Sequence, residues 1–474
     1  RGLGDVYKRQ GIPCIYNRAE TIRKNNRKRR RVKMNGILKR KLLYVKVRFI
    51  SPLNVSSGEN EWTDSDVLRD YEGNPFVAGS SLAGAMRAYI EKKKTESCLM
   101  GFSKPAGRQN ISDSGKMSSL FISDLNFDGG LVYGVRDNVA LSDAKTALSQ
   151  SKFDMEILEA GAKGHFYLEL VTREEDRATG REEEMEQELA RIFQGIQAGE
   201  IRIGSKKTRG FGQFKIESIG EKNYMKDNYL EYADAYDEAR WENCENVLKE
   251  WLDQSGWIPK MVQIEVPLQL KGGISIRQYA ARKGEPDFTQ LTDHGIPVVP
   301  GTSFAGEIRQ RIKTILQELK NTGATLPKEY SEIIDIAFGY VDKKRACSSN
   351  IIINESEIKN AKQLTMMRTG VSRLESAVKD GALYKEKTYV DGKLSLKARV
   401  KKGKCPEDEK WIIGVLLLAL KDLQNGFLAV GGQTAIGRGL FSADGPIRID
   451  GKEGLEDTYI AEAIKNMRMN GGGK

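Results

Sequence analysis

Two acidic residues, Asp64 and Asp287, each precede a copy of a motif suited to binding phosphate. The motif reads Gly-Ser-Ser from Gly79 and Gly-Thr-Ser from Gly301, and apolar residues follow it at helical spacing. A helix that begins after a tight glycine turn presents free backbone N–H groups, which favour a phosphate. An acid beside a phosphate is unfavourable unless a cation or proton transfer intervenes, and metal-assisted phosphodiester cleavage uses that arrangement.

The remaining acids and histidines near these motifs predict less chemistry. Asp66, Asp70 and Asp293 are expected to close turns or to be solvated, and the same interpretation stays open for both motif acids. The two histidines, His165 and His294, occupy non-equivalent positions, which excludes a nuclease with paired histidines in one repeat. His165 lies in a predicted strand and is expected to be structural.

Hydroxyl and basic residues in four blocks are candidates for contacting a polyanion. The blocks beginning at Gly79 and Gly301 would each bind a phosphate at a helix start, with an arginine two turns along. The glycine-rich blocks Gly204–Gly212 and Gly431–Gly439 lack the context of a Walker A loop and suggest a backbone nest. An ordinary helix cap with a solvated arginine, or a plain glycine turn, is the competing interpretation. The candidates are Ser80, Ser81, Arg87, Lys206, Lys207, Arg209, Thr302, Ser303, Arg309 and Arg438.

These blocks recur in the same order at near-constant spacing, which indicates a duplicated domain. Each copy starts with an alternating apolar segment typical of a half-buried strand, Leu43–Ile50 or Met261–Leu268. The expected order, strand–helix–strand twice, predicts an α+β fold of two ferredoxin-like domains resembling the RNA-recognition motif. A long excursion separates the two helices of each copy, at about Val135–Gly161 and Arg368–Gly392.

The basic charge is concentrated at the N-terminus. Residues 1–33 hold twelve Lys or Arg against Asp5 and Glu20, which accounts for +10 of the formal +11. The leader is interpreted either as non-native, with Met34 as the start, or as a basic arm. The expected division is a basic leader (1–33), a first domain (34–222), a helical connector (223–258), a second domain (259–450) and a C-terminal tail (451–474).

Composition limits the setting and the cofactors. No apolar run is long enough for a membrane span, and no signal peptide is visible. The five cysteines are widely spaced without a CxxC pair, so neither a zinc site nor a disulfide framework is expected. We therefore expect a cytoplasmic protein.

Taken together, the blocks resemble those of the RAMP superfamily, and most closely the repeated backbone subunits of type III CRISPR effector complexes. The two-repeat arrangement is similar to the fused double-backbone protein of the type III-D branch. The matching segments are Asp64–Asp70, Gly79–Arg87, Arg136–Val139 with Phe153–Glu156, and Gly204–Gly212, then Gly301–Arg309, Arg368–Val371 with Gly381–Tyr384, and Gly431–Gly439.

The resemblance implies two RAMP domains, each with a long thumb hairpin inserted in a palm that binds guide RNA. It also implies that Arg136 and Arg368 in the thumbs bind RNA. Asp64 and Asp287 would serve cleavage of target RNA with Mg²⁺ or another divalent metal. In the second copy, Phe288-Thr289-Gln290 departs from the family's Ser-Pro-Val, so cleavage there is the less secure expectation.

The partners implied are a CRISPR guide RNA, target RNA and other effector subunits. Those subunits would include further RAMP proteins and a large polymerase-like subunit, with no membrane involved. Two alternatives stay open: a guide-binding scaffold that does not cut, and a metal-independent endoribonuclease that processes CRISPR repeats. The sparse histidines and the tandem arrangement count against the second.

Overall fold

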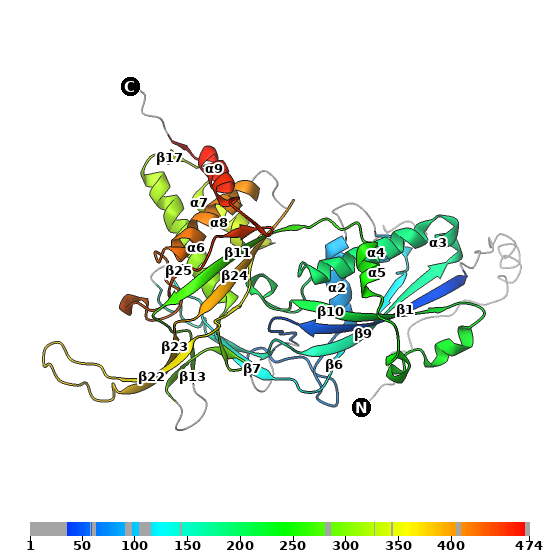
Figure 1. Ribbon diagram of the computed structural model, residues 1–474, viewed down its shortest axis with the longest axis horizontal. Helices are drawn as coiled ribbons and strands as arrows, with labels where there is room; N and C mark the ends of the chain where they lie inside the picture. Colours follow the sequence, from blue (N-terminus) through cyan, green and yellow to red (C-terminus); the bar gives the residue numbers. More distant parts are fainter. Residues whose placement is uncertain are drawn as a thin grey trace, which may run out of the picture.

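The chain forms two similar α+β units that lie side by side, as the computed structural model shows (Figure 1). No helix in the described part of the chain has the length and apolar character that crossing a membrane requires. The leader predicted at 1–33 lies outside the described residues. The structure describes residues 36–56, 58, 63–90, 97–103, 115–142, 145–279, 286–326, 328–342, 345–403 and 409–469.

The first repeat is an antiparallel sheet with helices packed on one face. Alternate residues of its central strand, such as Val45 and Phe49, are fully buried against Leu82 of α2 and Phe193 of α4. The sheet order is β10 (Phe214–Tyr224), β1 (Ile37–Phe49), β9 (Lys163–Arg173), β6 (Leu125–Phe127) and β2 (Phe76–Val77), with β5 (Leu120–Ile122) also on β9. The other elements are α2 (Gly79–Ile90), α3 (Glu174–Ala178), α4 (Arg181–Gln197), β3 (Phe102–Ser103), β4 (Gly115–Lys116) and the 3₁₀ turn η2 (Lys207–Arg209).

The second repeat has the same strand order around β11. The sheet runs β20 (Ile351–Ile353), β24 (Lys393–Lys401), β11 (Met261–Lys271), β26 (Arg448–Ile449) and β27 (Lys452–Glu453), with β25 (Leu440–Ala443) also on β11. Its helices are α6 (Gly301–Asn321), α7 (Tyr330–Phe338), α8 (Glu409–Gln424) and α9 (Glu456–Asn466). Shorter elements are β12 (Gly273–Ile274), β13 (Arg277–Tyr279), β14 (Phe288–Gln290), β15 (Thr292–Asp293), β16 (Ile296–Val299), β17 (Ala324–Thr325), β18 (Gly339–Asp342), β19 (Arg345–Ser348), β21 (Ser356–Glu357), β28 (Arg468–Met469) and η5 (Thr434–Ile436).

A β-hairpin leaves each repeat where the sequence has a long excursion. The first hairpin, β7 (Tyr133–Asn138) with β8 (Phe153–Leu158), reaches the second repeat. The second hairpin, β22 (Lys362–Arg368) with β23 (Tyr384–Val390), projects from the far end of the molecule (Figure 1). Its tip exposes apolar side chains among charged ones, and Leu374 is 98% accessible. The two hairpins therefore differ in that the first has a docking surface within this chain.

The connector and the tail both pack onto the repeats. The connector contains η3 (Tyr229–Asp234), η4 (Glu238–Trp241) and α5 (Leu248–Asp253), and Trp241 and Trp251 are buried against the first repeat. In the segment expected to be a tail, α9 lies against α8 so closely that a side chain at Gly414 would meet the Tyr459 carbonyl. Residues 451–469 are thus part of the second domain's packing.

The last residue of each glycine-rich block must be glycine, because another backbone segment passes too close for a side chain. Gly212 has a φ of +68°, and a Cβ there would lie 1.7 Å from the Ile203 carbonyl oxygen. Gly439 has a φ of +71°, and its Cβ would lie 1.9 Å from the Val430 carbonyl oxygen. The strand that follows each block can pair only if this residue lacks a side chain.

We expect Gly212→Ala to lower the free energy of unfolding by about 3 kcal/mol, because the methyl group must displace backbone. The matched control is Gly84→Ala on α2, where nothing lies within 4 Å of the added Cβ. That change should raise stability by about 0.5–1 kcal/mol through helix propensity. Urea denaturation measures both, and equal midpoints for the two variants would contradict the close approach.

Candidate nucleic-acid interface

Asp64 faces a second carboxylate at the base of the first hairpin. The backbone N–H of Asp64 donates to Asp154 Oδ1 at 3.0 Å, and the N–H of Asp154 donates to Asp64 Oδ2 at 2.9 Å. These reciprocal bonds hold the two acids together while one oxygen of each makes neither bond. Asp64 is exposed, so the pair can be reached from solvent. Two carboxylates with free oxygens are ligands that Mg²⁺ accepts.

The second repeat repeats this geometry with a different partner. Asp287 Oδ2 accepts a hydrogen bond of 2.7 Å from the backbone N–H of Lys385, the residue that corresponds to Asp154. Tyr384 precedes Lys385 as Phe153 precedes Asp154, which fixes the correspondence. The second site therefore has one carboxylate and an adjacent lysine, and the positive charge disfavours a cation there.

Neighbouring acids of the first loop have structural partners. Asp66 is buried and accepts bonds from the backbone and hydroxyl of Thr63, so it closes a turn as expected. Asp70 also closes a turn, and the backbone N–H of Asn74 holds its pKa below the usual range. Glu156 binds Arg69 through both oxygens, at 2.6 and 2.9 Å. This pair ties the Asp64 loop to the first hairpin.

The start of α2 already has an internal anion. The Asp124 carboxylate accepts from the N–H of Gly79 at 2.7 Å, so that N–H is not free for a phosphate. Ser80 and Ser81 are exposed beside it. Arg87 donates to the Gly101 carbonyl at 2.8 Å. Sequence reasoning missed Asp124 because it lies far along the chain from the helix it caps.

The start of α6 lies in a large cleft beneath the first hairpin. The cleft has a volume of about 1340 Å³, and the predicted residues Thr302, Ser303 and Arg309 line it. Lys145 of the hairpin bonds Glu307 of α6 at 2.9 Å and thereby spans the cleft. Lining residues that the sequence motifs did not single out include Lys145, Lys152, Arg277 and Lys313. The duplicated phosphate motif thus meets the preceding repeat's hairpin at this site.

Three basic side chains, those of Lys206, Arg209 and Arg309, lie close together where the first glycine-rich block meets α6. Burial, and then the charge of Arg209, lower the pKa of Lys206 to about 8. Lys206 donates to Asn138 of the first hairpin at 2.8 Å, and Lys207 beside it is exposed. Burial and the nearby charge of Arg309 lower the pKa of Arg209. Cations that repel one another in this way would be stabilised by an anion.

Arg136 and Arg368, predicted to bind RNA, have acidic partners within the chain. Arg136 is 5% exposed and lies 3.2 Å from Glu355 of the second repeat. Burial raises the pKa of Glu355 to about 7, although Arg136 opposes that shift. Arg368 is half-buried with its Nε 3.5 Å from Glu386. The first pair joins the two repeats, and only Arg368 keeps partial access to solvent.

Near Arg136, possible metal ligands converge at the junction of the repeats. Glu159, Asp293 and His294 place one ligand atom each within 4.8 Å of the others. His294 Nδ1 lies 2.7 Å from Asp293 and 3.3 Å from Glu159.

His165, expected to be structural, is buried in the first sheet and lies against Asp128 and Glu238.

The base of each hairpin is held by a different kind of contact. In the first repeat, Phe211 is buried against Met155 and Ile157. In the second repeat, the corresponding positions hold Arg438 and Glu386, which form a buried ion pair at 2.5 Å. Arg438, predicted to bind RNA, is 5% exposed and faces this acid. One repeat uses apolar packing where the other uses opposite charges.

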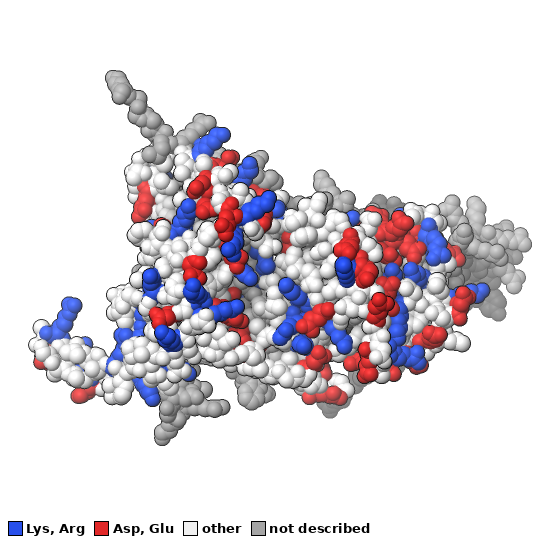
Figure 2. Space-filling view, in the orientation of Figure 1, with Lys and Arg blue, Asp and Glu red and all other residues white. Residues whose placement is uncertain are grey.

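Charge on the visible face of the molecule is mixed. Figure 2 shows lysine and arginine side chains interspersed with acidic ones over both repeats. This agrees with the near-neutral charge of the chain beyond its leader. A nucleic-acid site on this protein depends on local clusters, such as the one lining the cleft.

A double-mutant cycle tests whether the Arg438–Glu386 pair at the base of the second hairpin is equivalent to the Phe211–Met155 pair of the first. Arg438→Phe alone should lower the free energy of unfolding by about 3 kcal/mol, because Glu386 keeps only Arg368, 3.5 Å away, as a cationic partner. Glu386→Met should cost a similar amount. The double variant reproduces the first repeat's pair and should recover about 2 kcal/mol of the summed loss. Urea denaturation of the four proteins measures this, and additive losses would contradict the proposed equivalence.

Comparison with known proteins agrees with the duplication. A family model described as the RAMP superfamily matches the chain twice, at residues 46–215 and 270–442. No match was found among curated proteins. The two matched regions contain helices α2, α4, α6 and α8, both hairpins and both glycine-rich blocks. The chain therefore belongs to the RAMP superfamily as a two-repeat member, which indicates a CRISPR-associated, RNA-binding protein.

Proposed function

We propose that this protein is a guide-RNA-binding backbone subunit of a type III CRISPR ribonucleoprotein, of the fused double-backbone kind. The observation that carries the proposal is the cleft in which the first hairpin covers the phosphate motif of the second repeat. A single strand lying there would meet hydroxyl groups, backbone N–H groups and several cations. These contacts favour a sugar–phosphate backbone without selecting its sequence.

The arrangement of each repeat supports reading it as a palm and a thumb. Sheet order β10-β1-β9-β5 with two helices on one face supports a ferredoxin-like palm, and the hairpins would be the thumbs. The second hairpin would then cover the palm of a further RAMP protein, as the first covers the second repeat. Its exposed apolar residues, including Met367 and Leu374, favour such a partner. Target RNA and a large polymerase-like subunit complete the proposed assembly.

The first repeat would also cleave target RNA. Asp64 and Asp154, held together by reciprocal backbone hydrogen bonds, would bind Mg²⁺ or another divalent metal. The metal would stabilise the negative charge that develops on the phosphodiester during cleavage. Glu156 and Arg69 would hold the Asp64 loop against the hairpin base. Asp64 and Asp154 would each keep one oxygen directed to the cation while their backbone bonds fix the loop.

One observation in the second repeat favours the alternative that the protein binds guide RNA without cutting the target. Asp287 has Lys385 beside it in place of a second acid, so a cation would bind there more weakly. We therefore expect the first repeat to cut more efficiently than the second. Metal-independent repeat processing has less support, since His294 is engaged by Asp293 and Glu159.

Cleavage of a guide-matched RNA by the assembled complex tests this asymmetry. Asp64→Asn and Asp154→Asn should each lower the rate of the same cut by at least about a hundredfold. RNA binding should persist, because removing an acid relieves its repulsion of the phosphates. Asp287→Asn should affect a different, weaker cut, and Lys385→Asp should strengthen it. Mapping of product ends with and without chelator gives the result; a pattern unchanged by all four variants would make the chain a scaffold.

Salt dependence of guide binding tests the cleft itself. Arg309→Met should weaken binding and reduce the slope of log affinity against log salt by about one unit, because one phosphate contact is lost. Lys249→Met on the exposed face of α5 is the control, with no change in slope expected. Filter binding at several salt concentrations measures both slopes. Identical slopes would remove Arg309 from the interface.

A further inference from the structure

Two buried arginines meet at the junction of the repeats without an acid beside them. Arg202 follows α4 and is 4% exposed, and Arg399 lies on β24 and is 8% exposed. Burial lowers the pKa of both guanidiniums, and the charge of Arg399 lowers that of Arg202 further. Within the described part of the chain, neither has a carboxylate oxygen within 4.0 Å. Glu200 attracts Arg399 only from a greater distance.

Neutral amides hold the two guanidiniums in place. Gln213 Oε1 accepts from Arg202 Nη2 at 3.0 Å and from Arg399 Nη1 at 3.3 Å. Asn354 Oδ1 accepts from Arg202 Nη2 at 2.7 Å. Arg202 Nη1 and Arg399 Nε are buried without a partner. Amide oxygens orient these groups but do not neutralise them, and an uncompensated buried charge is strongly unfavourable.

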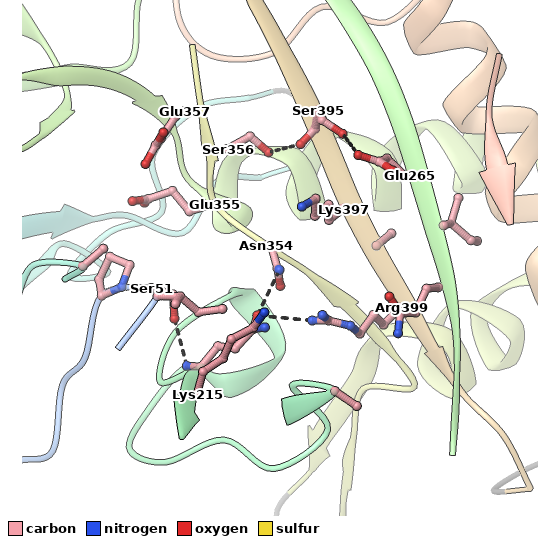
Figure 3. A pocket seen from close by; sticks show the side chains of 18 of the residues that line it. Ser51, Lys215, Glu265, Asn354, Glu355, Ser356, Glu357, Ser395, Lys397 and Arg399 are labelled. Carbon is pink, nitrogen blue, oxygen red and sulfur yellow. Dashed lines mark hydrogen bonds between the residues drawn. The ribbon is translucent and has the colours of Figure 1, made fainter. Parts of the chain in front are cut away.

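Arg399 lines a cleft of about 560 Å³ between the repeats, a volume typical of small-ligand sites. Figure 3 shows Arg399, Asn354 and Lys397 directed toward the same hollow. Lys215 lines it from β10 of the first repeat. This cleft shares no lining residue with the one beneath the first hairpin, which makes it a separate site.

The opposite wall of the cleft is acidic. Glu355 and Glu357 line it, whereas Glu265 of β11 lies beside its cross-strand partner Lys397 and accepts a hydrogen bond of 2.7 Å from Ser395. Such a wall repels a continuous polyanion, yet it accepts hydrogen bonds from amino, imino or hydroxyl groups. A ligand with one compact negative group and several donors satisfies both walls, and a nucleotide has that composition.

We propose that the cleft between the repeats binds a mononucleotide, with its phosphate at Arg399, Lys397 and Lys215 and its hydrogen-bond donors toward Glu355 and Glu357. The phosphate supplies the anion that the arginine pair lacks. Because residues of both repeats form the site, the bound ligand also fixes the angle between them. This site is independent of the guide-RNA function proposed above.

Isothermal titration of the full chain with the four nucleoside 5′-monophosphates tests the proposal. At least one should bind and raise the melting temperature, while the matching nucleoside without phosphate should bind at least about tenfold more weakly. Lys397→Met should weaken the nucleotide by about tenfold as well. Lys393→Met is the control, because Lys393 lies on the same strand outside the cleft and pairs with Asp444 on the surface.

Arg399→Met separates ligand binding from a purely structural role. Replacing an uncompensated buried charge should leave the free protein at least as stable, while the nucleotide no longer raises its melting temperature. Failure of every nucleotide to bind the wild type, or equal affinities for the Lys397 and Lys393 variants, overturns the proposal. A Lys397→Met variant that loses single-stranded RNA binding but retains nucleotide binding would also overturn the proposal. Arg309→Met reports on the guide site alone, so the two proposals fail separately.

Discussion

The backbone contact between the first glycine-rich block and the start of α6 fixes how the two repeats work together. A side chain at Gly301 would lie 2.2 Å from the Ile353 carbonyl oxygen and 2.3 Å from that of Arg209. The second repeat's helix therefore begins directly on the first repeat's loop. That contact brings the first hairpin over the second palm, where Lys145 reaches Glu307. Without it, neither the large cleft nor the basic cluster at its edge would form.

Duplication preserved this geometry while the chemistry of the two copies diverged. Both motif acids accept a bond from the returning strand of a hairpin, but an aspartate in one copy corresponds to a lysine in the other. At the hairpin base, Phe211 with Met155 in one copy corresponds to Arg438 with Glu386 in the other. The exchange beside the motif acid keeps the backbone hydrogen bond, and the exchange at the hairpin base replaces both partners together. The fold therefore tolerates both exchanges, although each changes the charge near its site.

Local patterns in the sequence were sufficient to predict the repeats, the first strand of each sheet, the helix starts and the long excursions between the helices. That each excursion forms a hairpin was implied only by the family resemblance. The local patterns also placed both aspartates beside the phosphate motifs. They could not predict that Arg136 faces Glu355, that Arg438 faces Glu386, or that Asp124 caps α2, because each partner lies far away in the chain. Residues 451–474 were predicted to form a C-terminal tail, and within that segment α9 packs on α8, close to Gly414.

Crosslinking of guide RNA within the assembled complex shows whether the RNA lies in the cleft between the first hairpin and α6. With 4-thiouridine in the guide, we expect crosslinked peptides from the first hairpin, residues 139–152, together with peptides from the start of α6 and the block 431–434. The same nucleotide should reach both sides, since Lys145 and Glu307 lie on opposite walls of one cleft. Crosslinks confined to the open faces of the two sheets would show that the guide does not lie in this cleft.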